Sequence, residues 1–336
     1  MKIVLAIFSR NDKILLVDKT LKKIGCDVRT VYTDAYRMIC PYYKKKIDKM
    51  GLSSSRIKYE TAWKENLYGL VEDFLPDLVL FVNTPKDIMA PHDLAYVRDK
   101  CRTACWFVDG ISERPEVLGY FPYFDKIFLF EECDVSYLDS VGVKASYLPV
   151  GYSEAFFKAP DKQRDIDLVF IGSPFPNRLE ILEAVAKEAE RKNWKLKIVG
   201  PFYDERYPWK HFLFKRKWRH IYKFLENRTV SPVEAADMYR RTKICLNIHA
   251  EKHKSPNPRT FEIMATESFL LMDDREYWGC ISKEDCAAYI TIEDLLDKIG
   301  YYLENEELRA RVARHGYNTV TEKLSMANML HRIVTS

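Results

Sequence analysis

Residues 244–274 read ICLNIHAEKHKSPNPRTFEIMATESFLLMDD and decide the fold of this chain. The apolar run 244–248 has the length and composition of a buried strand. A polar loop follows it, and Asn257 and Pro258 then form an N-cap and first-turn pair, which predicts a helix over 258–266. A second apolar run, 269–272, predicts another strand. Strand, helix and strand in this order are typical of a parallel α/β sheet.

The same alternation extends to both sides of this segment. Further buried strands are predicted over 3–8, 28–32, 78–82, 104–108, 127–130, 168–171 and 196–199. Helices are predicted over 13–25, 63–75, from about residue 178 onward, and over 232–241. Strands that are apolar on both faces suit a parallel sheet covered on both sides.

The alternation breaks near residues 148–151, and a polar stretch follows at 159–165. We therefore expect an N-terminal Rossmann-like domain over 1–150 and a second over 151–320. A final helix over 321–336 can pack back towards the first domain. The predicted fold class is α/β, with two doubly wound domains facing each other across a cleft that binds ligands.

Composition places the chain among soluble globular proteins. It has 336 residues, 47% hydrophobic and 30% charged, with a formal net charge of +4, which gives no reason to expect nucleic acid as a partner. No apolar stretch reaches the ~20 residues that span a bilayer, and the short run at the start resembles a strand more than an export signal. We expect a cytoplasmic protein whose eight cysteines are buried free thiols.

The predicted helix start at 258 is the first candidate phosphate site. The first turn of a helix presents unpaired N–H groups and attracts anions. Asn257 caps this turn, Lys254 and Arg259 add positive charge, and Glu262 lies one turn further on the same side. A carboxylate there can accept hydrogen bonds from both ribose hydroxyls of a nucleotide. The alternative is a surface helix on which Arg259 and Glu262 form only a solvated ion pair.

A second candidate phosphate loop follows the predicted strand 168–171. Gly172 and Ser173 end that strand, and Arg178 can hold a phosphate through two donors at once. Gly200 ends the next predicted strand in the same way and can form the wall around a nucleobase. A single glycine in each place is equally typical of an ordinary tight turn.

The C-terminal half is similar to the group 1 glycosyltransferases of the CgeB type, a branch with the GT-B architecture. The similarity rests on 168–173 with Arg178, on 231–249, on 259–265, and on 299–305 followed by Arg309, Ala313 and Gly316. The first half is less similar and matches at 106–109, 125–130 and 148–151. The resemblance implies a sugar-nucleotide donor bound by the C-terminal domain, Asn247 among its ligands, and an acceptor bound by the N-terminal domain. It also implies catalysis without a metal ion.

The resemblance suggests roles for three catalytic candidates. Retaining relatives often carry two glutamates eight positions apart; the second aligns with Glu262, but the first falls on Lys254, which can neutralise a leaving diphosphate. Glu267 stands where relatives commonly have glycine. Retention or inversion therefore stays open. In an inverting enzyme Asp109, after the strand 104–108, is the candidate general base, with His92 as second choice.

Each remaining candidate also has a structural interpretation. Asp109 can be a strand-end turn residue, and His249 can either donate to the phosphate or sugar or be a core histidine. Asp165 and Asp167 match an Asp-x-Asp pattern, but we interpret them as solvated charge beside a strand.

Residues 210–223, KHFLFKRKWRHIYK, alternate basic and aromatic side chains. Such a segment can lie on the inner face of an anionic membrane, which would suit a lipid-linked acceptor. The alternative is an ordinary exposed helix whose aromatic residues pack inward.

The function expected from these observations is sugar transfer from a nucleotide-diphosphate donor, most simply a UDP-sugar, with no further cofactor. The acceptor would be a cell-surface glycan, a glycolipid or a related molecule. Two other classes of function stay open. One is a non-catalytic nucleotide- or glycan-binding protein of an envelope or spore layer. The other is a sugar-nucleotide epimerase.

Overall fold

A computed structural model describes residues 1–7, 12–31, 54–86, 88–111, 114–159, 163–251, 253–276 and 278–336, with the backbone alone for 12–15 and 54–60. The last residues of the predicted strands 3–8 and 28–32 and part of the polar stretch 159–165 lie outside these ranges. The chain divides into two compact units. The first comprises Met1–Val150 and Met326–Ser336, and the second comprises Gly151–Ser325.

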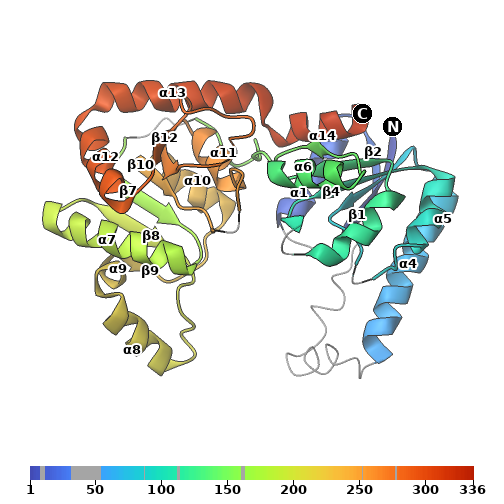
Figure 1. The fold of residues 1–336 in the computed structure, drawn as a ribbon, viewed down its shortest axis with the longest axis horizontal. Helices are drawn as coiled ribbons and strands as arrows, with labels where there is room; N and C mark the ends of the chain where they lie inside the picture. The colour runs from blue at the N-terminus through green and yellow to red at the C-terminus, as the bar shows by residue number, and fades with distance from the viewer. Residues whose placement is uncertain are drawn as a thin grey trace. The chain divides into compact units, whose positions relative to one another are not determined.

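The first unit contains a parallel sheet in the order β2-β1-β3-β4-β5-β6. Its strands are β1 (Lys2–Ile7), β2 (Asp27–Val31), β3 (Leu78–Val82), β4 (Arg102–Phe107), β5 (Lys126–Leu129) and β6 (Ser146–Tyr147). Its helices are α1 (Asp12–Lys23), α4 (Ser54–Phe74), α5 (Asp93–Lys100), the 3₁₀ helix η2 (Pro115–Tyr123), α6 (Glu132–Ser140) and α14 (Met326–Thr335). Strands β1 and β3 are buried along almost their whole length, because helices cover both faces of the sheet (Figure 1).

Helix α14 joins the first unit although it ends the chain. Its buried side chains, Met326, Met329, Leu330 and Ile333, recur at helical spacing and form one apolar stripe. The helix packs against α1 within this unit. The division between the units therefore falls after Ser325, whereas the sequence analysis placed it at residue 320.

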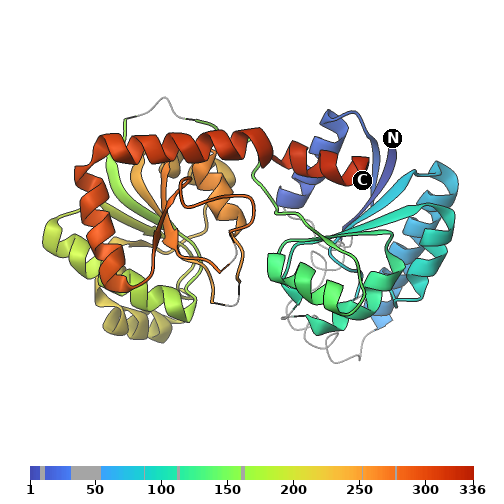
Figure 2. The same cartoon turned by 45° about the horizontal axis from the view of Figure 1, so that its top comes forward.

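The second unit contains a parallel sheet in the order β12-β11-β10-β7-β8-β9. Its strands are β7 (Ile166–Ile171), β8 (Leu196–Val199), β9 (Leu225–Glu226), β10 (Thr242–Asn247), β11 (Phe269–Asp273) and β12 (Ala287–Tyr289). Its helices are α7 (Pro176–Lys192), α8 (Pro208–Lys217), α9 (Arg219–Phe224), α10 (Pro232–Arg240), α11 (Pro258–Met264), α12 (Ile292–Glu304) and α13 (Glu306–Lys323). Helices α7 and α12 lie on one face, and α10, α11 and α13 lie on the other (Figures 1 and 2).

The strand order of the second sheet locates its binding edge. Numbered along the chain, these strands follow the order of dinucleotide-binding Rossmann sheets, which reverses beside the first strand of the unit. That reversal point lies between β7 and β10. Ligands of such sheets bind outside the carboxyl ends of the strands at this point, and the predicted strand over 168–171 and that over 244–248 correspond to these two strands. The α/β fold with two Rossmann-like units is confirmed.

Candidate functional site

The carboxyl end of β10 is joined to the start of α11 by amide side chains. The Asn257 side chain caps α11, because its Oδ1 accepts the backbone N–H of Arg259 at 3.0 Å. Asn247, the last residue of β10, is fully buried. Its Nδ2 donates to Asn257 Oδ1 at 3.1 Å and to Thr260 Oγ1 at 2.9 Å. Asn247 and Asn257 therefore set the geometry of this loop from inside the protein.

His249 is buried between the loop and the neighbouring strand β11. Its Nδ1 lies 2.9 Å from Asp273 Oδ1, and its Nε2 accepts the backbone N–H of Asn257 at 3.2 Å. Burial lowers the pKa of His249, although the hydrogen bond that it donates to Asp273 opposes this. Burial alone would raise the pKa of Asp273, but the bonds from His249 outweigh it and hold that pKa at about 2. The arrangement is a neutral imidazole that donates from Nδ1 to an ionised carboxylate.

The sequence left two roles open for His249, a donor to a phosphate or sugar and a core histidine. Both ring nitrogens are already used inside the protein, so the geometry supports the core-histidine alternative. His249 positions the backbone of the loop that leads into α11.

Arg275 fixes the same loop from its other side, and the sequence analysis did not identify it. Its guanidinium is paired with Asp273, and it donates to the backbone carbonyls of His253 and Lys254. A signal for this role is present in the sequence, because Asp273 and Arg275 directly follow a buried strand next to β10. Polar residues at the carboxyl end of such a strand lie at the binding edge of the sheet.

Arg178 crosses the reversal point between β7 and β10. It is buried at the start of α7, and its Nε donates to the Ile248 carbonyl at 2.6 Å. One terminal nitrogen donates to the Ser173 carbonyl at 3.1 Å, and the guanidinium lies 4.7 Å from the Phe175 ring centroid. Burial, and then the nearby charge of Arg259, lower the pKa of Arg178 to about 10. The two arginines are therefore close enough to repel each other.

Arg259 and Glu262 lie on α11 beside the buried hydroxyl of Tyr239. Arg259 Nε donates to Tyr239 Oη at 3.3 Å. Burial raises the pKa of Tyr239, the charge of Arg259 opposes this rise, and the charge of Glu262 adds to it. Both side chains are half-buried, so each can reach a ligand at the start of α11.

Arg178 and Arg259 differ from the other cationic groups at this edge, because Arg275 pairs with Asp273 and Lys254 pairs with Glu276. Within the described part of the chain, neither Arg178 nor Arg259 has a carboxylate within ion-pair distance. Helix α11 has only seven residues, so its dipole adds less than the sequence analysis assumed from a longer helix. Arg178 and Arg259 add formal positive charge at the same edge.

Gly200 is needed for a contact between backbones, and Gly172 lies close to an aromatic side chain. A Cβ atom on Gly200 would lie 1.9 Å from the Gly172 carbonyl oxygen, and one on Gly172 would lie 2.9 Å from the Phe170 ring. The Gly172 N–H donates to the Val199 carbonyl at 2.9 Å. The strand exits of β7 and β8 therefore touch directly at these positions. Ser173, next to Gly172, is exposed and offers its carbonyl to Arg178.

Of the remaining candidates, Lys254 belongs to the second unit, and Asp109 and His92 belong to the first. Lys254 is exposed and pairs with Glu276 at 3.0 Å. Asp109 belongs to the first unit, just after β4, and its carboxylate lies 3.4 Å from Arg114. His92 is exposed, also in the first unit.

The Asp-x-Asp carboxylates form ion pairs at the opposite edge of the second sheet. Asp165 pairs with Arg241 at 2.5 Å, and Asp167 pairs with Lys243 at 2.7 Å. Both lie where β7 begins, which agrees with their interpretation as surface charge.

Comparison with known proteins identifies the class to which this fold and edge correspond. Residues 178–335 match a family model described as glycosyl transferase-like. The C-terminal half of the chain is therefore similar to glycosyl transferase-like domains. Among individual proteins, the chain is 24% identical over 267 residues to the spore protein CgeB of Bacillus subtilis strain 168, covering 74% of this chain and 78% of that protein. The resemblance to CgeB-type glycosyltransferases is confirmed.

Solved structures confirm the two-domain GT-B architecture. A glycosyltransferase from Rickettsia africae superposes with a TM-score of 0.69 at 11% identity, covering 99% of this chain and 97% of that one. The Anabaena protein Alr3699/HepE, solved with UDP and glucose, superposes with a TM-score of 0.68 at 9% identity, covering 100% and 98%. At these identities the likeness concerns the fold.

Proposed function

We propose that this protein transfers a sugar, most simply a hexosyl group, from a nucleoside-diphosphate donor to a hydroxyl of an acceptor. The acceptor would be a cell-surface glycan, a glycolipid or a related molecule. The proposal rests on the glycosyl transferase-like match over 178–335 and on the cationic edge of the second sheet.

The observation that carries the proposal is the pair of guanidiniums, Arg178 and Arg259. Arg178 is buried at the start of α7 and Arg259 is half-buried at the start of α11. Burial, and then repulsion from the charge of Arg259, lower the pKa of Arg178. An anion bound between them would relieve this repulsion. A departing nucleoside diphosphate develops negative charge as the glycosidic bond breaks, so fixed cations stabilise that state more than the ground state. We propose that these residues perform the task without a divalent metal.

Glu262 supplies the second element of donor recognition in this proposal. Its carboxylate lies one turn beyond Arg259 on α11, and a ribose beside a bound diphosphate could donate both hydroxyls to it. Removal of a carboxylate that accepts such charge-assisted hydrogen bonds weakens binding by roughly 1.5–3 kcal/mol. Gly200 would lie beside the nucleobase. We propose uridine as the base, by analogy with the UDP-glucose complex of the Anabaena neighbour.

The first unit would hold the acceptor. If the reaction inverts configuration, Asp109 would take the acceptor proton. Lys254 could add positive charge near the diphosphate by leaving Glu276.

A donor-consumption assay tests the proposal. Purified protein is incubated with radiolabelled UDP-glucose and an extract of cell-surface glycans and lipids, with and without EDTA. We expect labelled product and released UDP, with rates unchanged by EDTA. Arg259→Gln should reduce the rate about tenfold or more, because one diphosphate cation is lost. Transfer that requires added Mn²⁺ or Mg²⁺ would contradict the metal-independent part.

A second candidate is a protein that binds sugar nucleotides without transferring the sugar. It is favoured by two observations: Lys254 stands where retaining relatives carry a glutamate, and His249 is fully engaged inside the protein. UDP binding without UDP release in the same assay would support it. Release of UDP with a rearranged free sugar would instead indicate an epimerase, the activity named for a structural neighbour from Listeria monocytogenes.

A further inference from the structure

Helix α8 presents large apolar side chains to solvent. Trp209 is 58% exposed, Phe212 63% and Leu213 54%. These residues and Arg216 are spaced i, i+3, i+4 and i+7, so they form one face of the helix, which we call the α8 stripe. The opposite side is covered, because Phe214 is buried and packs edge to face on Phe202 at 5.9 Å. Helix α8 is thus apolar on both sides, and the core covers one of them.

The sequence alternative of inward-packed aromatic residues in 210–223 holds for Phe214, Trp218 and Tyr222, which pack on the core of the second unit. It does not hold for Phe212, and Trp209, just before this segment, is exposed as well. In Figures 1 and 2 the helix lies at the periphery of its unit, beyond α9.

Basic side chains flank the α8 stripe, and α8 contains no acidic residue. Within the described residues, no carboxylate pairs with Lys210, Lys215, Arg216 or Lys217. Several of these amines lie over aromatic rings. Lys210 Nζ is 4.4 Å from the Tyr207 ring centroid, and Lys217 Nζ is 4.8 Å from that of Trp218. The surface therefore combines exposed rings with uncompensated positive charge.

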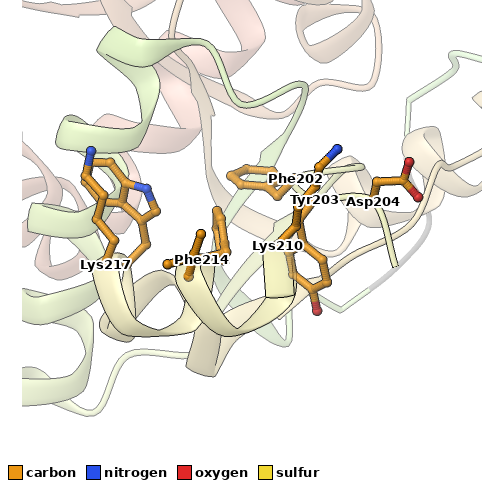
Figure 3. Close-up of a pocket in the computed structure, with 8 residues that line it drawn as sticks. Phe202, Tyr203, Asp204, Lys210, Phe214 and Lys217 are labelled. Carbon is orange, nitrogen blue, oxygen red and sulfur yellow. The ribbon is translucent and has the colours of Figure 1, made fainter. Parts of the chain in front are cut away.

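An open pocket of about 420 Å³ adjoins the α8 stripe. It is lined by Phe202, Tyr203, Asp204, Lys210, Leu213, Phe214, Lys217 and Trp218. Figure 3 shows Phe202 and Phe214 between Lys217 at one end and Lys210 at the other. The pocket thus has an apolar floor, an amine at each end and the carboxylate of Asp204 at the Lys210 end. The two amines suit the phosphate of an amphiphile.

We propose that α8 is the surface through which this protein binds an anionic phospholipid bilayer. The α8 stripe would enter the boundary between head groups and acyl chains, and the flanking lysines and arginines would contact lipid phosphates. No helix in the described ranges is long and apolar enough to cross a bilayer, so α8 would lie in the plane of the interface. The pocket adjoins the sugar-nucleotide edge, because Phe202 and Tyr203 follow Gly200 at the carboxyl end of β8, but the proposal requires no transfer activity.

Vesicle flotation with the full chain tests this proposal. Vesicles of phosphatidylcholine alone are compared with vesicles that contain about one third phosphatidylglycerol. We expect retention only on the anionic vesicles, and weaker retention at about 1 M salt, where the screening length falls to about 3 Å. The variant Trp209→Ser with Phe212→Ser should lower the partition coefficient at least about tenfold. Lys215→Glu with Arg216→Glu should do the same.

The control is Lys158→Glu with Lys187→Glu, which makes the same change in net charge at exposed positions away from α8. It should float like the wild type, and unchanged melting temperatures should show that all variants are folded. Equal retention of the control and the α8 variants, or equal binding to neutral vesicles, would overturn the proposal. Two further results would also overturn it: tighter binding to single-stranded RNA than to anionic vesicles, or a dimer that the α8 variants dissociate.

Discussion

The pairing of His249 with Asp273 determines how the loop before α11 is held. The imidazole bridges a carboxylate at the end of β11 and the backbone of Asn257. The Nε2 atom must carry no proton in order to accept that backbone N–H. The lowered pKa of His249 agrees with this requirement. Protonation of His249 would remove the acceptor and place a cation close to Arg178 and Arg275.

This pairing makes stability depend on pH. The pKa of His249 is lowered from its ordinary 6.5, so below that pH the unfolded chain binds a proton that the folded protein does not. The contribution of His249 to the free energy of unfolding should therefore be fully present above about pH 6.5. It should fall on acidification, by at most about 1.4 kcal/mol per pH unit. Asp273 should add a further loss as pH falls from about 4 towards its folded pKa of about 2. Urea unfolding between about pH 7.5 and 5.5 measures the first effect.

His249→Gln separates this contribution from those of other groups. The variant should be less stable at neutral pH but should lose less stability on acidification than the wild type. The exposed residue His331 supplies the matched control, since His331→Gln should keep the wild-type slope. Identical slopes for all three proteins would show that His249 is not the titrating group.

At the residue scale, the sequence predicted which residues lie at the binding edge better than it predicted what each of them does. Arg178, Asn247, Asn257, Arg259 and Glu262 lie around the carboxyl ends of β7 and β10, as the strand pattern indicated. The role of His249 was not predictable, because its partner Asp273 is 24 residues away and spacing does not show which nitrogens are occupied.

At the scale of elements, the contact between the exits of β7 and β8 depends on glycine. Gly200→Ala would place a methyl group against the Gly172 carbonyl and force the two loops apart. We expect a loss of about 1–3 kcal/mol in the free energy of unfolding, together with weaker nucleotide binding because the loop that carries Arg178 would shift.

Gly300→Ala is the matched control for this substitution. Gly300 lies inside α12, and a Cβ atom there would meet nothing within 4 Å. That variant should gain up to about 1 kcal/mol, since alanine favours a helix over glycine. Thermal or urea unfolding of both variants checks the pair. A Gly200→Ala protein as stable as the wild type would contradict the described contact.

The elements that the sequence predicted share a physical cause. Long strands buried on both faces are readable as apolar runs, and 78–82 and 196–199 match β3 and β8 residue for residue. The edge strands β6, β9 and β12 have two or three residues each, too few for a periodic pattern. The segment 210–223 is divided because Trp218 leaves the helical conformation, with φ −117° and ψ 57°.

One departure from related sequences has a conformational consequence. Glu267 has a φ of +52°, a left-handed conformation in which glycine is favoured. This explains the glycine commonly found there in relatives. Here the Glu267 carboxylate pairs with Arg314 at 2.7 Å.

At the scale of the whole molecule, topology and charge distribution point to the same edge of the second sheet as the proposed donor site. The reversal of strand order in the second sheet falls between β7 and β10. Arg178 joins these two strands, and Arg259 follows directly after the second one. The formal net charge of +4 did not indicate that positive charge gathers at this edge, because the many acidic and basic residues elsewhere nearly cancel in the total. The strand pattern predicted the fold, but the local excess of positive charge required the three-dimensional contacts.

The most direct test of the central claim is a thermal-shift measurement with UDP, GDP, dTDP, CMP and ADP. A ligand at about 100 times its dissociation constant stabilises the folded state by about 2.7 kcal/mol. The account predicts a selective rise in melting temperature with UDP. Glu262→Ala should weaken UDP binding by roughly 1.5–3 kcal/mol, whereas Glu293→Ala, an exposed glutamate on α12, should leave it unchanged. A protein whose melting temperature no nucleotide raises would contradict the claim that this edge binds a sugar-nucleotide donor.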